Sequence, residues 1–589
     1  MCGIAGLMTL EGGAPDRAAV ERMVDALAHR GPDGRGAYHA QDVAFAHNRL
    51  SIIDLKTGDQ PFDDNAVAAL IANGEIYNYI ELRAAHPELE FATESDCETP
   101  LRLYPAKGLD VAAELRGMYA LALHDRRENS LVLARDPFGI KPLYYVESKF
   151  GLAFASEPQA LIAGGFAEAS DLSERSLREL LSMQFTTGRD TVYRDIKRLL
   201  PGETLQARAG RVVERRTIPA LPLEPAAPFQ NEADALSALD AALMDSVLVH
   251  QRADVPYGMF LSGGIDSSAL LAAMAQLNER PVRAFTAGFS ESTAHDERAH
   301  ARAVAKAAGA DHVEIDFGEQ DFFSLLPRVA AALDDPVADY ATLPTYKLGQ
   351  KAAEDGLKVV LCGEGGDELF AGYGRYRSAT RPWWRGGGKA MRARSALERL
   401  GLLRQAPHGW RDGVAAAEHL LQGAGLTRLQ QVQAIDCAEW LPNDLLIKLD
   451  RCLMAHSVEG RTPLLDPVIA NVAFALPDDL KVRGRTGKWL LRKWLDEKMP
   501  AARAFEPKRG FTVPVGEWIN REGAKLGPLV AAQPGVAQMC PPERVRGIFT
   551  QAGKHQNFAA WILLFFALWH HIHVLGHAPE GDVFDCLAA

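Results

Sequence analysis

Cys2 is the first side chain whose type and position indicate chemistry. It follows the initiator methionine, and a small second residue is the condition for methionine removal. The processed chain would begin with a thiol beside a free α-amine, which titrates near pH ~8 and can accept the thiol proton. The resulting thiolate could attack an amide carbonyl. A single cysteine at this position is more often an incidental small apolar residue, so the hypothesis depends on what accompanies it.

The segment Asn73-Gly74-Glu75-Ile76-Tyr77-Asn78 supplies groups that an amide hydrolase needs. The Asn73 amide and the Gly74 backbone N–H follow an apolar run and could bind an oxyanion. Arg49 can form two parallel hydrogen bonds with a substrate carboxylate, while Glu75 and Asp96 could bind an ammonium group. Each charged residue, taken alone, is more often part of a surface ion pair. Together they predict a site that binds an amino acid.

A second candidate site begins at Leu261-Ser262-Gly263-Gly264-Ile265-Asp266-Ser267-Ser268, where a predicted buried strand turns into a helix. The glycines allow a ligand to approach the backbone, and the serines and the helix N-terminus add hydrogen-bond donors and partial positive charge. The loop lacks the lysine of a Walker A motif. A Gly-rich turn alone is usually an ordinary connection, but this pattern is narrower and predicts an anion-binding loop.

Acidic residues accompany this loop. Another turn, Gly363-Glu364-Gly365-Gly366-Asp367-Glu368, follows the apolar run 358–362, so Asp266 and Asp367 would lie at strand ends on one edge of a sheet. Two such carboxylates could share a Mg²⁺ that also binds phosphate oxygens. Helix capping is the simpler alternative for either residue alone. Lys488 could neutralise a departing pyrophosphate, although a solvated helix lysine is the more common case.

The elements that must position these residues fall into two parts. Up to about residue 200, short apolar runs alternate with turns, which predicts a strand-rich α+β layer structure. These runs include 43–46, 67–71, 118–123 and 131–133. Prolines at 219, 222, 225 and 228 favour extended chain, so residues 206–231 are the predicted linker between domains at 2–205 and 232–589.

After the linker, Asn231 can cap a helix, and predicted helices and strands then alternate as far as the strand 358–362. This order predicts a doubly wound parallel sheet, in which ligands bind at the carboxyl ends of the strands. From about residue 395 the chain is mostly helical. It includes the apolar run Phe558 to Trp569, which at 12 residues is shorter than the ~20 of a spanning helix and predicts a buried core helix.

Several motifs, in this order, resemble two known families. MCGIAG, HRGPDG, HNRLSI, NGEIYN, SDCE and RDPFGIKPLYY resemble the class II glutamine amidotransferase domain, an N-terminal-nucleophile hydrolase. FLSGGIDSS, DDPVADYATLPTY, GEGGDELFAGY, SVEGRTPLLD, GKWLLRK and PKRGF resemble the synthetase half of glutamine-hydrolysing asparagine synthetase. The resemblance implies an N-terminal-nucleophile layered sandwich followed by an α/β doubly wound ATP-pyrophosphatase domain with a helical carboxyl-terminal part.

The resemblance also assigns roles to residues of this chain. It implies that Cys2 is the nucleophile, that Asn73 and Gly74 form the oxyanion hole, and that Glu364 and Lys488 act near an acyl-adenylate. The residues implied to bind glutamine are Arg49, Asn73, Glu75 and Asp96. Those implied to bind ATP are Leu261, Ser262, Gly263, Gly264, Asp266, Ser267, Ser268 and Gly363, and those implied to bind Mg²⁺ are Asp266 and Asp367.

By the same resemblance, glutamine hydrolysis at Cys2 would supply ammonia to a carboxylate activated by ATP, in the family the side chain of aspartate. The products would be asparagine, AMP, pyrophosphate and glutamate. Cys362, Gly460, Thr462 and Glu506 depart from the residues usual in the family. Cys362, Gly460 and Thr462 lie beside the expected ATP and acceptor sites, so the alternative is a related enzyme that amidates a different, specialised carboxylate.

The composition limits the partners and the cellular location that can be expected for the protein. Lys and Arg number 64 against 76 Asp and Glu, a formal net charge of −12 that disfavours nucleic acid and anionic membranes as partners. Seven cysteines form no C-x-x-C pair, and no secretory signal is evident at the amino terminus, which favours a cytoplasmic protein. The expected partners are therefore small molecules, namely glutamine, ATP and aspartate or another carboxylate; a homodimer is compatible with the sequence.

Two local features of the sequence suggest other functions, namely RNA binding and metal binding. Residues 375–394 combine seven basic residues with Trp383 and Trp384, a pattern that could bind RNA, although Pro382 and the triple glycine 386–388 favour a solvated loop. His570, His571, His573 and His577 suggest a metal site. Without carboxylates or thiols at ligand spacing, an exposed helix end is the preferred interpretation.

Overall fold

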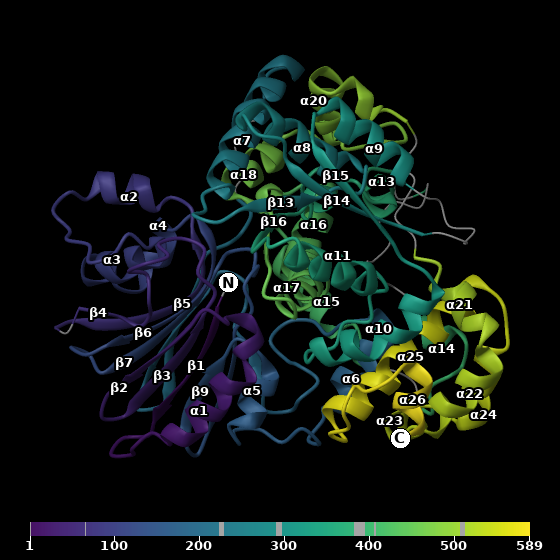
Figure 1. Cartoon of the computed structure of the whole chain (residues 1–589), viewed down its shortest axis with the longest axis horizontal. Coiled ribbons are helices and arrows are strands. Elements are labelled where there is room, and N and C mark those ends of the chain that lie inside the picture. The colour runs from purple at the N-terminus through teal and green to yellow at the C-terminus, as the bar shows by residue number, and fades with distance from the viewer. Residues whose placement is uncertain are drawn as a thin grey trace.

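The computed structural model describes residues 2–64, 66–222, 229–289, 297–381, 384, 395–405, 408–506 and 513–589. Its amino-terminal half contains two antiparallel sheets, which lie at the lower left of Figure 1. The first has the order β10 (Lys197–Arg198), β8 (Tyr144–Ser148), β9 (Gly151–Ala155), β1 (Gly3–Thr9), β3 (Val43–Arg49), β2 (Gly34–His39). The second has the order β12 (Arg211–Thr217), β11 (Glu203–Arg208), β7 (Ser130–Arg135), β6 (Gly117–Asp125), β5 (Ala68–Ile76), β4 (Phe62–Asp63).

The two sheets pack face to face because apolar residues from both meet in one core. Ile4 and Phe45 of the first sheet and Ile71 and Leu133 of the second belong to the same buried cluster. Helices α1 (Arg17–Ala26) and α5 (Pro158–Ala163) cover the outer face of the first sheet, and α3 (Thr99–Lys107) covers the second. The predicted α+β layer structure is therefore confirmed.

The predicted linker is partly wrong. Its first residues form β11 and β12, which pair with each other and, through β11, with β7 of the second sheet. The sequence did not reveal β12 because four of its seven residues are charged and all seven are exposed or half-exposed, as an edge strand allows. Residues 223–228 of the predicted linker lie outside the described part of the chain.

The second half contains a parallel sheet with the order β15 (Asp311–Asp316), β14 (Arg283–Gly288), β13 (Tyr257–Phe260), β16 (Val359–Leu361), β17 (Glu459–Arg461). All four neighbouring pairs are parallel. The chain runs outward from β13 to β15 and then resumes at β16 on the other side of β13. This reversal makes the gap between β13 and β16 the topological switch point, where ligands of such sheets bind. The predicted doubly wound sheet is confirmed.

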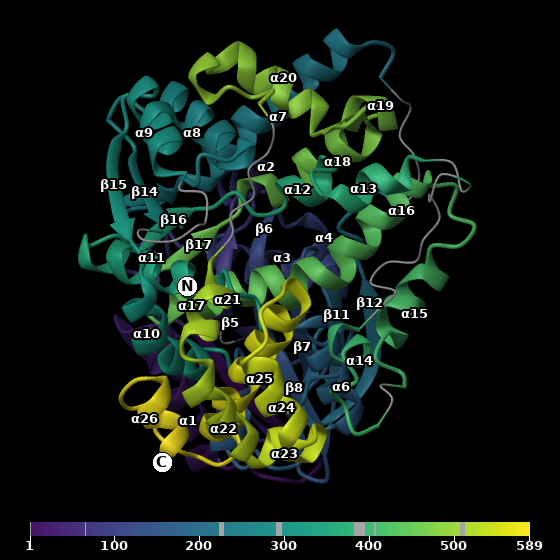
Figure 2. The same ribbon diagram turned by 90° about the vertical axis from the view of Figure 1, so that its right-hand side faces the viewer.

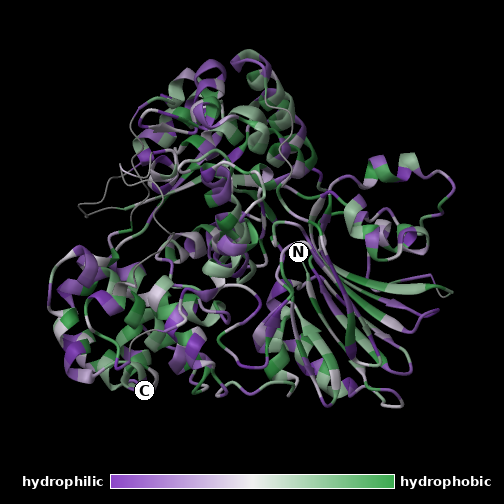
Figure 3. Cartoon of the chain, turned by 180° about the vertical axis from the view of Figure 1, so that it is seen from behind, coloured by the Kyte–Doolittle hydropathy of each residue, from purple (hydrophilic) through white to green (hydrophobic). Residues whose placement is uncertain are grey.

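Helices cover this sheet as the sequence predicts. Asn231 caps α7 (Glu232–His250) by accepting a hydrogen bond from the Asp234 amide at 2.8 Å. The loop after β13 leads directly into α8 (Ile265–Leu277), and α9 (Arg298–Ala307) and α11 (Thr342–Glu354) lie between later strands. Figure 3 shows apolar and polar residues mixed along these elements. In α9 the buried residues Ala301, Val304 and Ala305 lie on one side of the helix, whereas α8 is buried at every residue from Ser267 to Met274.

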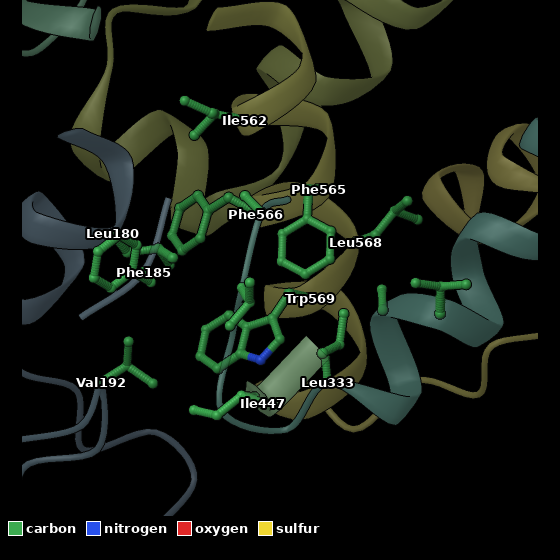
Figure 4. Close-up of a cluster of buried hydrophobic side chains, with 14 of the residues drawn as sticks. Leu180, Phe185, Val192, Leu333, Ile447, Ile562, Phe565, Phe566, Leu568 and Trp569 are labelled. Carbon is green, nitrogen blue, oxygen red and sulfur yellow. The ribbon is translucent and has the colours of Figure 1, made fainter. Parts of the chain in front are cut away.

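The helical carboxyl-terminal part is built around α25 (Lys554–His573), in which every residue from Ala559 to Trp569 is buried. Figures 1 and 2 show it among the other carboxyl-terminal helices, beside α10 (Glu319–Ala332) and α6 (Glu174–Met183). Figure 4 shows its aromatic side chains meeting Leu180 and Phe185 of the amino-terminal half and Leu333 and Ile447 of the second half. The predicted core helix is confirmed, and it joins the two halves.

No helix among the described residues combines the length and the hydropathy needed to cross a membrane. The apolar α25 is instead enclosed by protein on all of its faces, as its burial shows.

The histidines at the end of α25 are not exposed, so the interpretation of this segment as an exposed helix end is wrong. His570, His571 and His573 are buried, and His573 Nε2 lies 2.9 Å from the Ala330 carbonyl oxygen. The chain after the helix folds back, and the His577 ring stacks on His571 with centroids 4.1 Å apart. Burial lowers the pKa of His573 to about 4, so the ring is neutral. In the described part of the chain no three His, Cys, Asp or Glu side chains are grouped to bind a metal.

Candidate active sites

Cys2 lies directly before β1, the strand between β9 and β3 in the first sheet. Its backbone N–H donates to Asn73 Oδ1 at 3.0 Å, and its carbonyl accepts from Arg30 Nε at 3.1 Å. The residue is buried, which raises the pKa of the thiol. A thiol in such a position needs a neighbouring base to ionise.

Asn73 and Gly74 lie in β5 and face the start of the chain. With its oxygen bonded to the Cys2 N–H, Asn73 has its Nδ2 buried and without a hydrogen-bond partner among the described residues. Burying an N–H group without a hydrogen-bond acceptor costs free energy, unless a bound ligand supplies the acceptor. Gly74 packs so closely on β6 that a Cβ atom would lie 2.2 Å from the Met118 carbonyl oxygen. The Asn73 side chain therefore lies beside Cys2, and Gly74 follows it in the same strand. Their role as oxyanion donors stays a prediction.

Two acidic residues predicted to bind an ammonium group are buried in the same region. Asp96 Oδ2 accepts a hydrogen bond from the Ile76 N–H at 2.6 Å, and burial raises the pKa of this carboxyl. Glu75 is also buried, which raises its pKa well above the usual range. Its Oε2 lies 3.2 Å from Nη2 of Arg461, a residue of the second half.

Arg49 is buried at the end of β3, but its guanidinium is already engaged. Nη1 donates to Asp59 Oδ1 at 2.7 Å, and Nη2 donates to the carbonyl oxygens of Ile53, at 3.3 Å, and Asp54. The Asp59 side chain is 81% exposed, so this ion pair can be exchanged for a substrate carboxylate at little cost. The role of Arg49 stays a prediction.

The second site lies at the switch point of the parallel sheet. The loop after β13 turns at Gly263, whose φ of 73° is unfavourable for residues with a Cβ atom. Ser262 Oγ and Ser267 Oγ lie 3.1 Å apart, and the Gly264 N–H donates to Ser262 Oγ at 3.2 Å. Gly264 caps α8, so the unpaired N–H groups of that helix face the loop. This is the predicted anion-binding geometry.

Asp266 in the first turn of α8 and Asp367 in α12 (Gly366–Leu369) converge on one buried lysine. Lys488 Nζ lies 2.6 Å from Asp367 Oδ1 and also donates to Asp266. Burial acts to lower the pKa of Lys488, but the two carboxylates outweigh it and the pKa is raised. The interpretation of Lys488 as a solvated lysine is thereby excluded.

Glycines allow this convergence. A Cβ atom at position 366 would lie 2.3 Å from Asp266 Oδ1, and one at 372 would lie 1.7 Å from Asp367 Oδ1. A Cβ atom at 363 would lie 3.2 Å from the Ser267 amide nitrogen. Lys488 itself has a φ of 56°, an uncommon backbone conformation for lysine, and its N–H donates to the Phe370 carbonyl at 3.0 Å.

The paired carboxylates also suit a divalent cation. Asp266 and Asp367 already face a common positive charge, and carboxylate oxygens are the ligands that Mg²⁺ prefers. The donor set on the protein is small, as expected for a cation that also binds substrate phosphates. These residues therefore fit the predicted metal.

Glu364 follows β16 beside the same loop. Burial raises the pKa of this carboxyl, while Lys448 of α17 (Leu446–Met454) opposes the shift. Lys448 is buried, and its Nζ lies 3.2 Å from Asp339 Oδ2. Lys448 was not among the residues predicted from the sequence. The signal that could have revealed it is a lysine within the otherwise apolar helix segment Leu445-Leu446-Ile447-Lys448-Leu449.

Buried arginines that join the two halves were also missed. Arg30 binds both carboxylate oxygens of Asp450 in α17, at 2.8 and 3.1 Å, and Glu157 at 2.6 Å. Arg461 of β17 contacts Glu75, as described above. No local pattern distinguishes these arginines, because the partner that each finds in the other half lies more than 100 residues away in the sequence.

The basic segment 375–394 does not begin as a solvated loop. Arg375 lies in α13 (Gly374–Ala379), where its guanidinium is 3.8 Å from the Trp440 ring centroid and its Nε donates to Asp436 at 2.7 Å. This part of the earlier interpretation is wrong, because an aromatic and an acidic partner fix Arg375 in place. Residues 382–383 and 385–394 lie outside the described part of the chain.

Two protein-family models match the chain. The asparagine synthase model matches residues 238–571, more than half of the chain, and the glutamine amidotransferase domain model matches residues 1–217. The second match ends at the last residue of β12, and the first ends within α25.

Relatives with curated names align with most of the chain. Glutamine-hydrolysing asparagine synthetase 1 of Bacillus subtilis is 32% identical, and the alignment covers 99% of this chain and 100% of the relative. Glutamine-hydrolysing asparagine synthetase B of Escherichia coli is 30% identical, with 88% of this chain and 84% of the relative covered. The amidase chyE of Penicillium rubens is 32% identical over 64% of this chain and 60% of its own length.

Proposed function

Because the chain belongs to the asparagine synthase family of glutamine-hydrolysing carbon–nitrogen ligases, we propose that it couples glutamine hydrolysis at Cys2 to ATP-dependent amidation of a carboxylate. The acceptor that the family favours is the side chain of aspartate. The products are then asparagine, glutamate, AMP and pyrophosphate. The seven cysteines are all unpaired, which suits a cytoplasmic enzyme with a thiol nucleophile.

In the amino-terminal half, the Cys2 thiolate attacks the side-chain amide of glutamine. After methionine removal the Cys2 nitrogen is an α-amine, which takes the thiol proton and stays within reach of Asn73 Oδ1. Asn73 Nδ2 and the Gly74 N–H donate to the oxyanion. Ammonia leaves, a thioester remains on Cys2, and water hydrolyses it to glutamate. Glu75 and Asp96 hold the α-ammonium group, and Arg49 holds the α-carboxylate.

In the second half, the acceptor carboxylate attacks the α-phosphorus of ATP and pyrophosphate leaves. The backbone N–H groups and serine hydroxyls from Leu261 to Ser268, with Gly363, bind the phosphates of ATP, a substrate. A Mg²⁺ ion held by Asp266 and Asp367 would supply charge neutralisation of these phosphates. Lys488 is the protein's own cation at this position, and its ammonium group stabilises charge on the leaving pyrophosphate.

Ammonia then attacks the acyl carbon and AMP leaves, which forms the amide. Glu364, whose pKa burial raises, is suited to accept the proton that ammonia loses. The observation that carries the proposal is the convergence of Asp266, Asp367 and Lys488 at the ends of β13 and β16. Such a cluster has a clear use in pyrophosphate release and none in glutamine hydrolysis.

A specialised acceptor is the alternative, and a structural observation favours keeping it. Gly460 packs against α17, where a Cβ atom would lie 2.8 Å from Leu453 and 3.2 Å from Leu449. Gly460, which departs from the residue usual in the family, therefore contacts α17, the helix that carries Lys448. Lys448 in turn acts on the pKa of Glu364. The existence of a relative named an amidase is in keeping with variation of the acceptor.

The test supplies ATP, Mg²⁺ and glutamine with a panel of carboxylates that includes aspartate. We expect AMP, pyrophosphate, glutamate and an amide with one acceptor. If aspartate alone supports the reaction, the chain is an asparagine synthetase; if only another acid does, the alternative holds. Formation of ADP and phosphate with every acceptor would contradict the proposal.

A further inference from the structure

The glutamine site is not built from the amino-terminal half alone. Glu75 is the penultimate residue of β5, and residues after the strand contact the second half directly. The Tyr77 ring lies 4.0 Å from the His250 ring, centroid to centroid. Arg252 donates to the Tyr77 carbonyl oxygen and pairs with Glu81 at 2.6 Å. The segment that follows Glu75 is thus held in place by residues of the second half.

Arg461 is the charged group at the centre of this contact. It is fully buried, and its Nε donates to Glu459 Oε1 at 2.6 Å. Its Nη1 donates to the carbonyl oxygens of His250 at 2.9 Å and Arg252 at 2.7 Å. These three acceptors, all from the second half, fix the guanidinium plane. Its remaining nitrogen, Nη2, is the one that lies 3.2 Å from Glu75 Oε2.

Neither of these two atoms has a well-directed hydrogen-bond partner among the described residues. A carboxylate oxygen that is buried, ion-paired and not hydrogen-bonded can accept a bond from a ligand. We propose that Arg461 is a positioning residue of the glutamine site, which holds the Glu75 carboxylate in place for the substrate's ammonium group.

The electrostatics around Glu75 agree with this role. Burial raises its pKa, Glu459 and Asp96 raise it further, and Arg461 is the arginine that lowers it. Glu459, on the same strand as Arg461, has a pKa of about 2, since positive charges that include Arg461 and Lys141 outweigh its burial. Tyr77 and His250 complete the titratable groups of this contact, and burial keeps both neutral by raising the pKa of the first and lowering that of the second to about 3. Without Arg461, the amino terminus would be the one remaining positive charge among the groups that act most strongly on the pKa of Glu75.

The same residue touches the synthetase site through its backbone. The Arg461 carbonyl oxygen accepts a hydrogen bond from the Cys362 N–H at 2.8 Å, and Cys362 directly precedes Gly363 and Glu364. A single residue of β17 therefore contacts Glu75 with its side chain and, with its main chain, the residue that precedes Gly363 and Glu364. This inference deepens the proposed glutaminase activity and rests on it.

The test compares Arg461→Gln and Arg461→Lys with Arg198→Lys in the full chain. Arg198 is a matched control: it is also buried, and it joins the halves by its ion pair with Asp335, 2.7 Å away, but it touches neither candidate site. Glutamate release from glutamine and AMP formation from ammonium salts are measured for each variant, with thermal unfolding beside them.

We expect R461Q to raise the KM for glutamine by about tenfold or more, with kcat changed less and ammonia-driven AMP formation within about twofold. Its acidic limb of kcat/KM for glutamine should move to higher pH, because the Glu75 carboxylate then forms only at higher pH. R461K should keep the position of that limb and show a smaller rise in KM. R198K should lower the melting temperature without changing the KM for glutamine or the pH of the acidic limb.

An unchanged KM and pH profile in R461Q would overturn the inference, as would equal loss of the glutamine- and ammonia-driven reactions. If R461Q does not fold, the same criteria apply to R461K, whose KM must then rise while the ammonia-driven reaction persists. Failure of the proposed function is a separate outcome, since the unaltered chain would then release no glutamate at all.

Discussion

Asn73 shows how one side chain can serve two steps. Its oxygen accepts a hydrogen bond from the Cys2 nitrogen, which fixes the amide and leaves Nδ2 buried without a partner among the described residues, as the proposed oxyanion donor requires. The geometry exists before any substrate binds. Such preorganised donors stabilise a developing charge without reorganisation during the reaction.

Replacing this amide should separate the two activities. We expect Asn73→Ala to reduce kcat for glutamine hydrolysis by roughly 10²–10³-fold, as for other lost oxyanion donors. Asn78→Ala is the matched control, because its Nδ2 donates instead to the Glu114 carbonyl, 2.8 Å away. Steady-state release of glutamate measures the effect. A loss in both variants would mean that the strand end, and not the donor, is what matters.

Removal of the nucleophile gives a sharper separation. Cys2→Ala should abolish glutamate release, because no thiolate remains to form the thioester. Ammonium salts should still support AMP formation, since the second site lies in the other half of the chain. Coupled assays of glutamate and AMP on one preparation make the comparison. Loss of the ammonia-driven reaction as well would argue against two separable sites.

At the scale of elements, the turns after β13 and β16 determine the second site. Both leave the sheet at its switch point, and glycines let Asp266, Asp367 and Lys488 approach one another. The glycine at 366 is required by space, since its φ is not in the left-handed region, whereas Gly365 also needs its φ of 92°. The turn sequence is thus constrained by side-chain contact as much as by backbone conformation.

A methyl group at position 366 should therefore damage the synthetase site alone. Gly366→Ala places a Cβ atom 2.3 Å from Asp266 Oδ1, so the carboxylate must move away from Lys488. We expect ATP-dependent amide formation to fall at least about a hundredfold, as for displacement of a charged group from a transition state. Gly318→Ala, where nothing lies within 4 Å of the added atom, should leave it unchanged. Intact glutaminase activity in both variants would show that the effect is local.

Much of this element-level picture could be predicted from the sequence. Short apolar runs separated by turns predicted the strand-rich layers of the amino-terminal half. The alternation of strands with helices predicted the parallel sheet and the edge at which Asp266 and Asp367 meet. β12 was missed because an exposed edge strand carries charged residues and no apolar pattern. Lys448 was missed because the residues around it in the sequence do not indicate its partner, Asp339, which lies more than 100 residues away.

At the scale of the whole molecule, the two halves share one interior. The α25 cluster in Figure 4 combines side chains from both, and the buried arginines Arg30 and Arg198 form ion pairs across the boundary. These contacts are non-local, so the sequence could not reveal them. The same reason explains why the histidines of α25 and Arg375 were placed wrongly: their partners lie far away in the chain.

A shared interior predicts that the halves unfold together. Trp569 is fully buried in α25, and its Nε1 lies 3.4 Å from the Asp334 carbonyl oxygen. Trp569→Ala should lower the free energy of unfolding by about 3–5 kcal/mol. Leu420→Ala, at a side chain that is 82% exposed, should change it little. Denaturant unfolding followed by fluorescence and by loss of glutaminase activity should give coincident curves; separate transitions would contradict the shared interior.

The central claim is that one chain joins ammonia release to adenylation of a carboxylate. It is tested most directly with an acceptor whose carboxylate carries ¹⁸O, incubated with ATP, Mg²⁺ and glutamine. Adenylation followed by displacement of AMP transfers one carboxylate oxygen to the phosphate of AMP. We therefore expect one ¹⁸O in AMP by mass spectrometry, together with one glutamate for each amide formed. Label in inorganic phosphate with production of ADP, or AMP without label, would contradict the claim.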